Sequence, residues 1–375
     1  MKKLTKIKLV DLSRQNRIIK KQLMNSIEET VDIADFILGK KLKKFETDFA
    51  KFCNKKYAVG VNSGTDGLTL SLMAYGIGNG DEVIVPVNSY FSTAMVVSNL
   101  GAIPVFVDVD SEFYNIDTRK IESAITDKTK AIIPVHLYGQ PAEMDKILKI
   151  ANKFKLIVVE DACQAHGSIY KNKIIPYTQT GVFSFYPGKN LGAFGDGGAV
   201  VTDNKKIYEK IIYLRNDGSN QKYLHKMLGM KSRLDTLQAG ILSVKLPYLK
   251  KWNDLRRKHA GIYSKLLEDI PQIRTPKQNL NAQHVFHLYV IECTNRDKLK
   301  DYLSLKGIET VIHYPIPIHL QKPYLNLGFK VGNFPIAEEK SKKILSLPMF
   351  PELTSKEIIY ICKTIKEFYL KTFSK

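Results

Sequence analysis

Residues 57 to about 202 alternate between short apolar runs and segments with helical spacing. Each run is rich in valine and isoleucine and nearly all apolar, which is typical of strands in a sheet covered on both faces. The predicted strands are 57–61, 82–86, 104–108, 131–135, 156–160, 181–185 and 198–201. Between them, segments such as 66–75 and 143–154 have apolar residues at helical intervals. The alternation predicts a three-layer α/β domain with a mostly parallel sheet.

The pattern changes near residue 250. The later part predicts a long helix over 250–267, a strand over 285–292, a helix over 297–306, a strand near 310–314 and a terminal helix over 355–370. We therefore expect two domains. Residues 1–249 would form the large α/β domain, including an N-terminal helical segment, and residues 250–375 a smaller α+β domain.

Composition is that of an ordinary globular protein, with 44% hydrophobic residues in 375. No apolar run approaches the roughly 20 residues that a membrane-spanning helix needs. The basic start of the chain is interrupted by Lys8 and Asp11, so no export signal is predicted. The four cysteines are far apart and lack zinc-type spacing, so neither a metal site nor a disulfide framework is expected. A cytoplasmic protein without membrane contact is the expectation.

The net charge of +20 would suit a nucleic-acid-binding protein. However, the lysines are spread over amphipathic segments such as 40–56 and 340–343, and are not interleaved with aromatic residues in one block. We interpret the charge as a solvated, lysine-rich surface without a nucleic-acid partner. Such a field can also attract a phosphorylated substrate.

Two charged residues stand at the ends of neighbouring predicted strands. Lys189 lies in the turn after strand 181–185, and Asp161 follows strand 156–160. In open α/β sheets, ligands bind at the carboxyl ends of the strands. A lysine can form a Schiff base with the aldehyde of pyridoxal 5'-phosphate (PLP), while a carboxylate keeps the pyridine nitrogen protonated. The alternatives are a surface lysine, and an aspartate that caps a helix or pairs with an arginine.

Other residues at this edge could complete a cofactor site. Gly64 and Thr65 follow the first strand and open a helix, which suits a phosphate, although such a turn is also a common helix cap. Ser184 could reach the same phosphate. Tyr90 follows the second strand and could stack on the cofactor ring, with an ordinary core aromatic as the alternative.

Taken in order, several segments resemble the sugar aminotransferases of the DegT/DnrJ/EryC1/StrS family, which have the fold type I architecture of PLP enzymes. The matching segments are 36–39, 62–66, 80–86, 104–110, 134–139, 160–167, 189–192, 195–199 and 232–239. They extend over nearly the whole chain.

The resemblance implies a role for each candidate residue. Lys189 would carry PLP and act as the catalytic acid and base, Asp161 would hold the pyridine nitrogen, Gln164 would contact the ring hydroxyl, Tyr90 would cover one ring face, and Gly64, Thr65 and Ser184 would bind the phosphate. It also implies a homodimer with shared active sites, in which segment 216–233 reaches the partner's site. There the family usually has asparagine where this chain has Lys231.

The resemblance further implies the reaction. Lys189 stands where dehydratase relatives carry histidine, which favours transamination from L-glutamate to a nucleotide-linked keto sugar. Segment 309–321 is most similar to the branch acting at C3 of dTDP-3-keto-6-deoxyhexoses, where Tyr186, His313 and Tyr314 would contact the hexose. This branch serves deoxysugar biosynthesis, as for O-antigen or S-layer polysaccharides. UDP-linked sugars, 4-keto sugars, a PLP-dependent sugar dehydratase and a non-enzymatic PLP-binding regulator stay open as alternatives.

Overall fold

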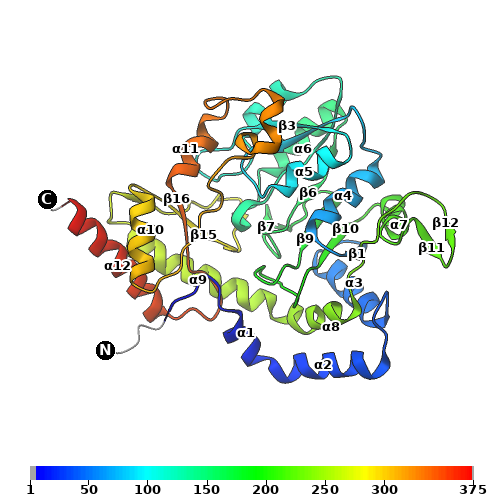
Figure 1. Cartoon of the computed structure of the whole chain (residues 1–375), viewed down its shortest axis with the longest axis horizontal. Helices are drawn as coiled ribbons and strands as arrows, with labels where there is room; N and C mark the ends of the chain where they lie inside the picture. Colours follow the sequence, from blue (N-terminus) through cyan, green and yellow to red (C-terminus); the bar gives the residue numbers. More distant parts are fainter. Residues whose placement is uncertain (1–5, 374–375) are drawn as a thin grey trace.

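The computed structural model describes residues 6–373 and is built around one continuous sheet (Figure 1). Its strands are β1 (Tyr57–Val61), β2 (Glu82–Pro86), β3 (Ile103–Val107), β4 (Thr129–Ile132), β5 (Ile157–Val158), β6 (Glu160–Asp161), β9 (Thr180–Ser184) and β10 (Gly198–Thr202). β5 and β6 are two parts of one strand, since Val159 and Asp161 donate backbone hydrogen bonds of 3.1 and 2.9 Å to the same neighbouring segment. The order is β3-β2-β4-β5/β6-β9-β10-β1.

Among the described strands of this sheet, β10 alone runs antiparallel to its neighbours. Helices cover both faces. The core on one face includes side chains of α4 (Gly64–Tyr75), α5 (Ser92–Asn99) and α7 (Lys205–Leu214). The core on the other includes side chains of α3 (Lys40–Phe52), α6 (Met144–Phe154) and α8 (Thr236–Lys245). The predicted three-layer architecture with a mostly parallel sheet is confirmed, because the fully apolar strands are buried on both sides.

The C-terminal part has its own core. A three-stranded antiparallel sheet packs against helices; its elements are α9 (Leu249–Leu267), β13 (Ile273–Arg274), β15 (Tyr289–Cys293), α10 (Arg296–Leu305), β16 (Ile344–Leu347) and α12 (Ser355–Phe373). The three helices predicted here form with nearly the expected bounds. The division of the chain at residue 249 stays a prediction.

Two strand predictions in this part were inaccurate. The strand expected over 285–292 begins only at Tyr289, because Val285 and Leu288 donate backbone hydrogen bonds across to residues 138–139 of the large sheet's loops. The strand expected near 310–314 does not form. Val311 makes only an isolated bridge with Ser346, and the chain then turns toward the cavity described below. In both places, contacts with distant segments override the local strand preference.

The first described residues belong to the C-terminal core. Ile7 is buried there, and its backbone exchanges hydrogen bonds of 2.8 and 2.9 Å with Gly307 and Glu309. The chain then forms α1 (Leu12–Ile18) and α2 (Lys20–Ile33), and α2 packs against α8. Residues 7–9 therefore lie beside the segment that leads to His313 and Tyr314.

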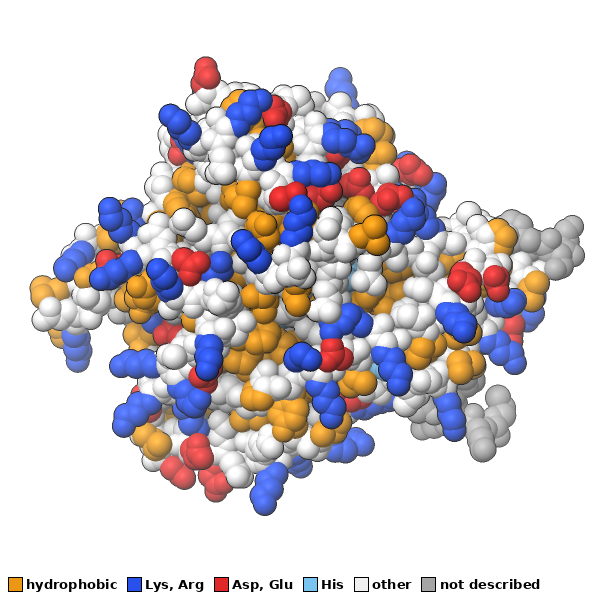
Figure 2. Space-filling model, turned by 180° about the vertical axis from the view of Figure 1, so that it is seen from behind, with side chains coloured by type: hydrophobic (Ala, Val, Ile, Leu, Met, Phe, Trp, Pro, Cys, Tyr) orange, Lys and Arg blue, Asp and Glu red, His pale blue; other side chains and the backbone are white. Residues whose placement is uncertain are grey.

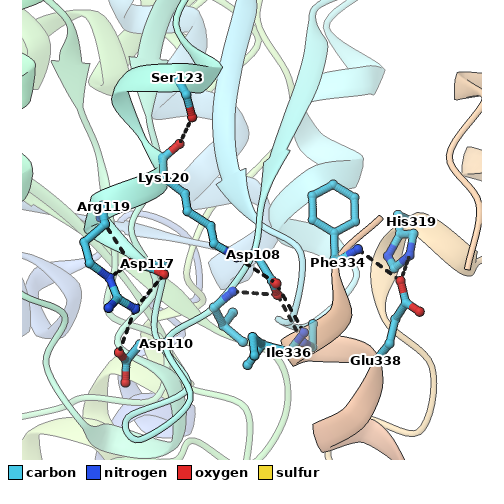
Figure 3. A network of polar contacts seen from close by, with 12 residues as sticks. Asp108, Asp110, Asp117, Arg119, Lys120, Ser123, His319, Phe334, Ile336 and Glu338 are labelled. Carbon is cyan, nitrogen blue, oxygen red and sulfur yellow. Dashed lines mark hydrogen bonds and ion pairs between the residues drawn. The ribbon is translucent and has the colours of Figure 1, made fainter. Parts of the chain in front are cut away.

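A polar network ties the C-terminal part to the large sheet (Figure 3). Asp108, just after β3, accepts hydrogen bonds of 3.2 and 3.0 Å from the amides of Ile336 and Ala337, at the start of α11 (Pro335–Lys343). On the same helix, Glu338 pairs with the buried ring of His319 at 3.1 Å. Unpaired amides at a helix start are satisfied by such a carboxylate. The network thus anchors both ends of the segment from His319 to α11.

Short strands complete the fold. β7 (Ile169–Tyr170), β8 (Lys173–Ile174) and β14 (Ala282–Gln283) form a small sheet. A hairpin of β11 (Ser219–Gln221) and β12 (Leu224–His225) projects from the edge of the molecule opposite α10 and α12 (Figure 1). Lys and Arg side chains are scattered over the face seen in Figure 2 and do not gather in one block. Within residues 6–373, no helix combines the length and apolar character needed to cross a bilayer.

Candidate active site

A cavity of about 540 Å³ lies at the carboxyl ends of the central strands. All ten residues singled out from the sequence line it: Gly64, Thr65, Tyr90, Asp161, Gln164, Ser184, Tyr186, Lys189, His313 and Tyr314. They belong to segments spread along the chain, from the start of α4 to the C-terminal part. Their convergence places the expected cofactor residues and the expected sugar residues in one chamber, while their individual roles stay predictions.

Lys189 lies in the turn after β9, where its amide donates a 2.9 Å hydrogen bond to the Tyr186 carbonyl. Among the described residues that line the cavity it is the single Lys or Arg. Burial lowers the pKa of the Lys189 amine, while the nearby Cys163 and Asp161 act in the opposite direction. A lowered pKa makes a neutral, nucleophilic amine more accessible near pH 7.

Asp161 is held by two donors from different elements. One carboxylate oxygen accepts a 3.2 Å hydrogen bond from the Cys163 amide, and the other accepts a 3.0 Å hydrogen bond from the Thr93 hydroxyl on α5. Thr93 is itself paired with the Ser89 hydroxyl at 2.9 Å. The carboxylate is buried, with 6% of the residue exposed, yet it lines the cavity that Lys189 enters. Its orientation is therefore fixed before any ligand arrives.

The start of α4 lines the part of the cavity that is best suited to an anion. Ser63 caps the helix by accepting a 3.0 Å hydrogen bond from the Asp66 amide, which leaves earlier amides free of helical partners. A Cβ atom at Gly64 would lie 2.6 Å from the Cys163 sulfur and 2.9 Å from Ser184 Cβ. The glycine is thus needed for α4 to approach Ser184 this closely. Helix amides facing a serine hydroxyl are a suitable phosphate site.

The opposite wall is aromatic and polar. Gln164 donates a 3.1 Å hydrogen bond to the Tyr314 hydroxyl, and the Tyr90 and Tyr314 rings lie 6.1 Å apart. His313 shares a 2.8 Å hydrogen bond with Ser346. Burial and the Lys189 charge lower the pKa of His313 to about 4, so this ring is neutral at pH 7. Tyr90 and Tyr186 are each 59% exposed, which leaves them available to a ligand or a second subunit.

Some lining residues were missed by sequence reasoning: Leu9, Val10, Thr93, Asp196 and His287. Thr93 lies on the helix that follows Tyr90, so the rule that ligands gather at strand ends could have found it. Leu9 and Val10 reach the cavity through pairing with residues some 300 positions away, and no local pattern signals such a contact.

A second cavity, of about 610 Å³, lies near the amino ends of the strands and includes Lys55, Tyr177 and Asp203. It contains none of the ten predicted residues. The residues predicted to bind the cofactor and the sugar therefore all line the smaller cavity of about 540 Å³.

Comparison with known proteins gives relatives that match almost the full length. The chain is 45% identical over 97% of its length to a "Pleiotropic regulatory protein" of Geobacillus stearothermophilus, covering 98% of that protein. It is 44% identical over 96% to the UDP-N-acetyl-3-dehydro-alpha-D-glucosamine 3-aminotransferase of Acidithiobacillus ferrooxidans, covering 98%. It is 40% identical over 97% to the dTDP-3-amino-3,4,6-trideoxy-alpha-D-glucose transaminase of Streptomyces venezuelae, covering 96%.

Solved structures of similar proteins have the same fold over nearly the whole chain. S. venezuelae DesV in complex with a ketimine intermediate superposes with a TM-score of 0.95 at 40% identity, over 97% of this chain and 98% of that one. NtdA from Bacillus subtilis with bound cofactor PMP (the pyridoxamine form) superposes with a TM-score of 0.89 at 32% identity, over 97% and 86%. The family model for the DegT/DnrJ/EryC1/StrS aminotransferases matches residues 17–366. The chain belongs to the DegT/DnrJ/EryC1/StrS aminotransferase family.

Proposed function

We propose that the protein is a PLP-dependent aminotransferase that moves an amino group from L-glutamate to C3 of a nucleotide-linked keto sugar, with a dTDP-3-keto-6-deoxyhexose as the preferred substrate. The observation that carries this proposal is the shared cavity, in which Lys189 and Asp161 face Tyr186, His313 and Tyr314.

The residues present fit PLP. The start of α4 and Ser184 offer amides and a hydroxyl to a phosphate, and Gly64 leaves room for it. The buried Asp161 carboxylate would hold a protonated ring nitrogen through a charge-assisted hydrogen bond. Tyr90 would cover one ring face. The relative NtdA, in the same fold, holds the pyridoxamine form.

When bound, PLP supplies an aldehyde for the amine and a ring that accepts electrons. Lys189 would provide the amine, because it is the single Lys or Arg in the cavity lining among described residues. Its lowered pKa increases the share of neutral amine, so the nitrogen can take up a proton and return it, as a general base and acid must. Asp161 would face the ring nitrogen, with its carboxylate oriented by Thr93 and the Cys163 amide.

The sugar would lie against Tyr186, His313 and Tyr314. Both transaminase relatives carry names that place the amino group at C3, one on a dTDP sugar and one on a UDP sugar. Their similarity to this chain supports amination at C3, and leaves the nucleotide as the point that an assay decides. The neutral His313 ring and the Tyr314 hydroxyl can both donate and accept hydrogen bonds with sugar hydroxyls.

A homodimer with shared sites is part of this proposal. Lys189 is the single Lys or Arg among the described lining residues to meet the charges of a cofactor phosphate and a nucleotide diphosphate, since burial lowers the pKa of His287 and His313 and disfavours their charged forms. The projecting hairpin and the residues that follow it carry Lys222, Lys226 and Lys231, together with exposed apolar residues such as Tyr223 and Leu228. A second copy whose hairpin reaches this cavity would supply the missing positive charge.

The test is an assay of the purified protein with L-glutamate and a panel of dTDP- and UDP-linked 3-keto and 4-keto sugars. We expect a 3-amino sugar by mass spectrometry, with the highest kcat/KM for the dTDP 3-keto substrate. A 4-amino product would refute amination at C3, and a deoxygenated keto product would indicate a dehydratase. Cofactor binding without turnover of any panel member would favour a regulator, as the name of the Geobacillus relative suggests for that protein.

A further inference from the structure

The turn at residues 137–139 joins three segments of the cavity wall. It forms a short 3-10 turn, η3 (Leu137–Gly139), in which Tyr138 adopts a left-handed conformation with φ of 60°. The backbone carbonyls of Tyr138 and Gly139 accept hydrogen bonds of 3.2 and 3.1 Å from Leu288 and Val285. A left-handed backbone is unusual for a tyrosine and is retained where the surroundings determine it.

Tyr138 makes two further hydrogen bonds, both to the wall of the cavity that contains Gln164, His313 and Tyr314. Its amide donates a 2.7 Å hydrogen bond to the side-chain oxygen of Gln164. Its hydroxyl donates a hydrogen bond to the backbone carbonyl of His313. The side chain is 3% exposed, and burial raises the pKa of Tyr138, so the hydroxyl keeps its proton and acts as the donor.

These contacts close a ring. The Gln164 oxygen is taken by Tyr138, and the Gln164 nitrogen donates a 3.1 Å hydrogen bond to the Tyr314 hydroxyl. Tyr314 follows His313, whose carbonyl returns to Tyr138. Tyr138 thus ties the expected cofactor residue Gln164, through its backbone amide, to the expected sugar residues His313 and Tyr314, through its hydroxyl. A closed ring of hydrogen bonds of this kind favours one arrangement of its members.

We propose that Tyr138 is a positioning residue that sets the place of the His313–Tyr314 segment relative to Gln164, and so controls sugar binding without touching the sugar. Tyr138 is not among the residues that line the cavity. The inference rests on the proposed function, because it assigns the sugar to His313 and Tyr314. It predicts that losing the Tyr138 hydroxyl damages the sugar half-reaction and spares the glutamate half-reaction.

Tyr138→Phe tests this by removing a single oxygen atom. We expect KM for the nucleotide-linked keto sugar to rise about 5- to 10-fold, as for loss of one buried hydrogen bond, and the rate of the glutamate half-reaction to stay within about twofold of wild type. Calorimetry should show the same loss in sugar-nucleotide binding without turnover. Rates are normalised to the amplitude of the glutamate half-reaction, which counts folded, cofactor-loaded sites even when part of the protein is unfolded.

Tyr114→Phe is the matched control. Tyr114 is also buried and left-handed, with φ of 64°, and its ring lies 5.7 Å from that of Tyr138. Its hydroxyl donates instead to Glu292 at 2.7 Å, away from the cavity. We expect the control to leave sugar affinity unchanged.

Three results would overturn the proposal: equal sugar affinities in the two variants, equal damage to both half-reactions, or additive effects on sugar binding when Tyr138→Phe is combined with Tyr314→Phe. Coupled residues of one network give non-additive changes. An active glutamate half-reaction with no sugar turnover in the wild-type protein would instead count against the proposed substrate.

Discussion

Thr93 and Asp161 stand 68 positions apart in the chain, yet the Thr93 hydroxyl donates a 3.0 Å hydrogen bond to the Asp161 carboxylate. Thr93 is 1% exposed and lies on α5, whereas Asp161 ends the strand at the centre of the sheet. The contact therefore ties the orientation of the carboxylate to the packing of a helix on one face of the sheet.

Thr93→Val should weaken PLP binding about tenfold, since a hydrogen bond to a buried carboxylate is lost while the side-chain volume is kept. The dissociation constant for PLP, followed by its absorbance, measures the effect. Thr364→Val is the control, because Thr364 is also buried but bonds within α12. Unchanged PLP affinity in the Thr93 variant would show that Asp161 needs no such support.

Lys189→Ala should reduce turnover by about 10⁴-fold, because the cavity then lacks its amine acid and base. Borohydride reduction of the wild-type protein should fix the cofactor on the peptide that contains Lys189, as detected by mass spectrometry, and the variant should give no such adduct. Lys205→Ala, on the exposed surface of α7, should behave as wild type. An adduct on another lysine would contradict the assignment.

The buried His284 should make the protein less stable in acid. Its Nδ1 accepts a 2.8 Å hydrogen bond from the Phe286 amide, and burial lowers its pKa to about 3. Between pH 3 and the unfolded value of about 6.5, the unfolded chain binds more protons at this residue, so stability falls as pH decreases through this window. At pH 5 the loss from this group is about 2 kcal/mol.

Thermal melts from pH 5 to 7.5 measure this effect. His284→Asn keeps an acceptor for the Phe286 amide, and its Tm should fall less on acidification than that of the wild type. Thr364→Val, which replaces a buried side chain that does not titrate, should leave the pH slope unchanged. A wild-type slope in the His284 variant would rule out this residue as a source of acid sensitivity.

Shared active sites predict complementation between inactive subunits. Lys189→Ala should be inactive, and so should a variant in which a short Gly-Ser linker replaces residues 219–228 of the hairpin. Mixing them under conditions of subunit exchange should restore activity, since one site of the mixed dimer combines an intact Lys189 with an intact hairpin. Mixed dimers seen by native mass spectrometry without activity would exclude this arrangement.

The sequence contained enough local information for the large sheet and for one end of the site. Apolar runs such as 57–61 and 82–86 coincide with β1 and β2. A strand buried on both faces is nearly all apolar, so its bounds can be recognised in the sequence. Lys189 and Asp161 could be placed for a related reason. Once two strands are known to be parallel neighbours, the residues that follow them must lie at one edge.

The wall of the cavity that contains His313 and Tyr314 was less predictable, since contacts between distant segments determine its structure. Segment 310–314 has the residues of a strand, but the Tyr138 hydroxyl and Ser346 hold His313 away from a regular ladder. His287 lines the cavity because its segment crosses to residues 138–139, and nothing within its own stretch indicates that crossing. The family resemblance, rather than periodicity, indicated His313 and Tyr314.

The pairing of Ile7 with Gly307 and Glu309 has a consequence for synthesis on the ribosome. Leu9 and its hydrogen-bond partner Glu309 are separated by 300 positions. At about 5–20 residues per second, Leu9 waits roughly 15–60 s after its own synthesis before its partner Glu309 is made. Leu9, Val10, His313 and Tyr314 all line the cavity, so a nascent chain can fold the central sheet long before it can close the chamber around a sugar.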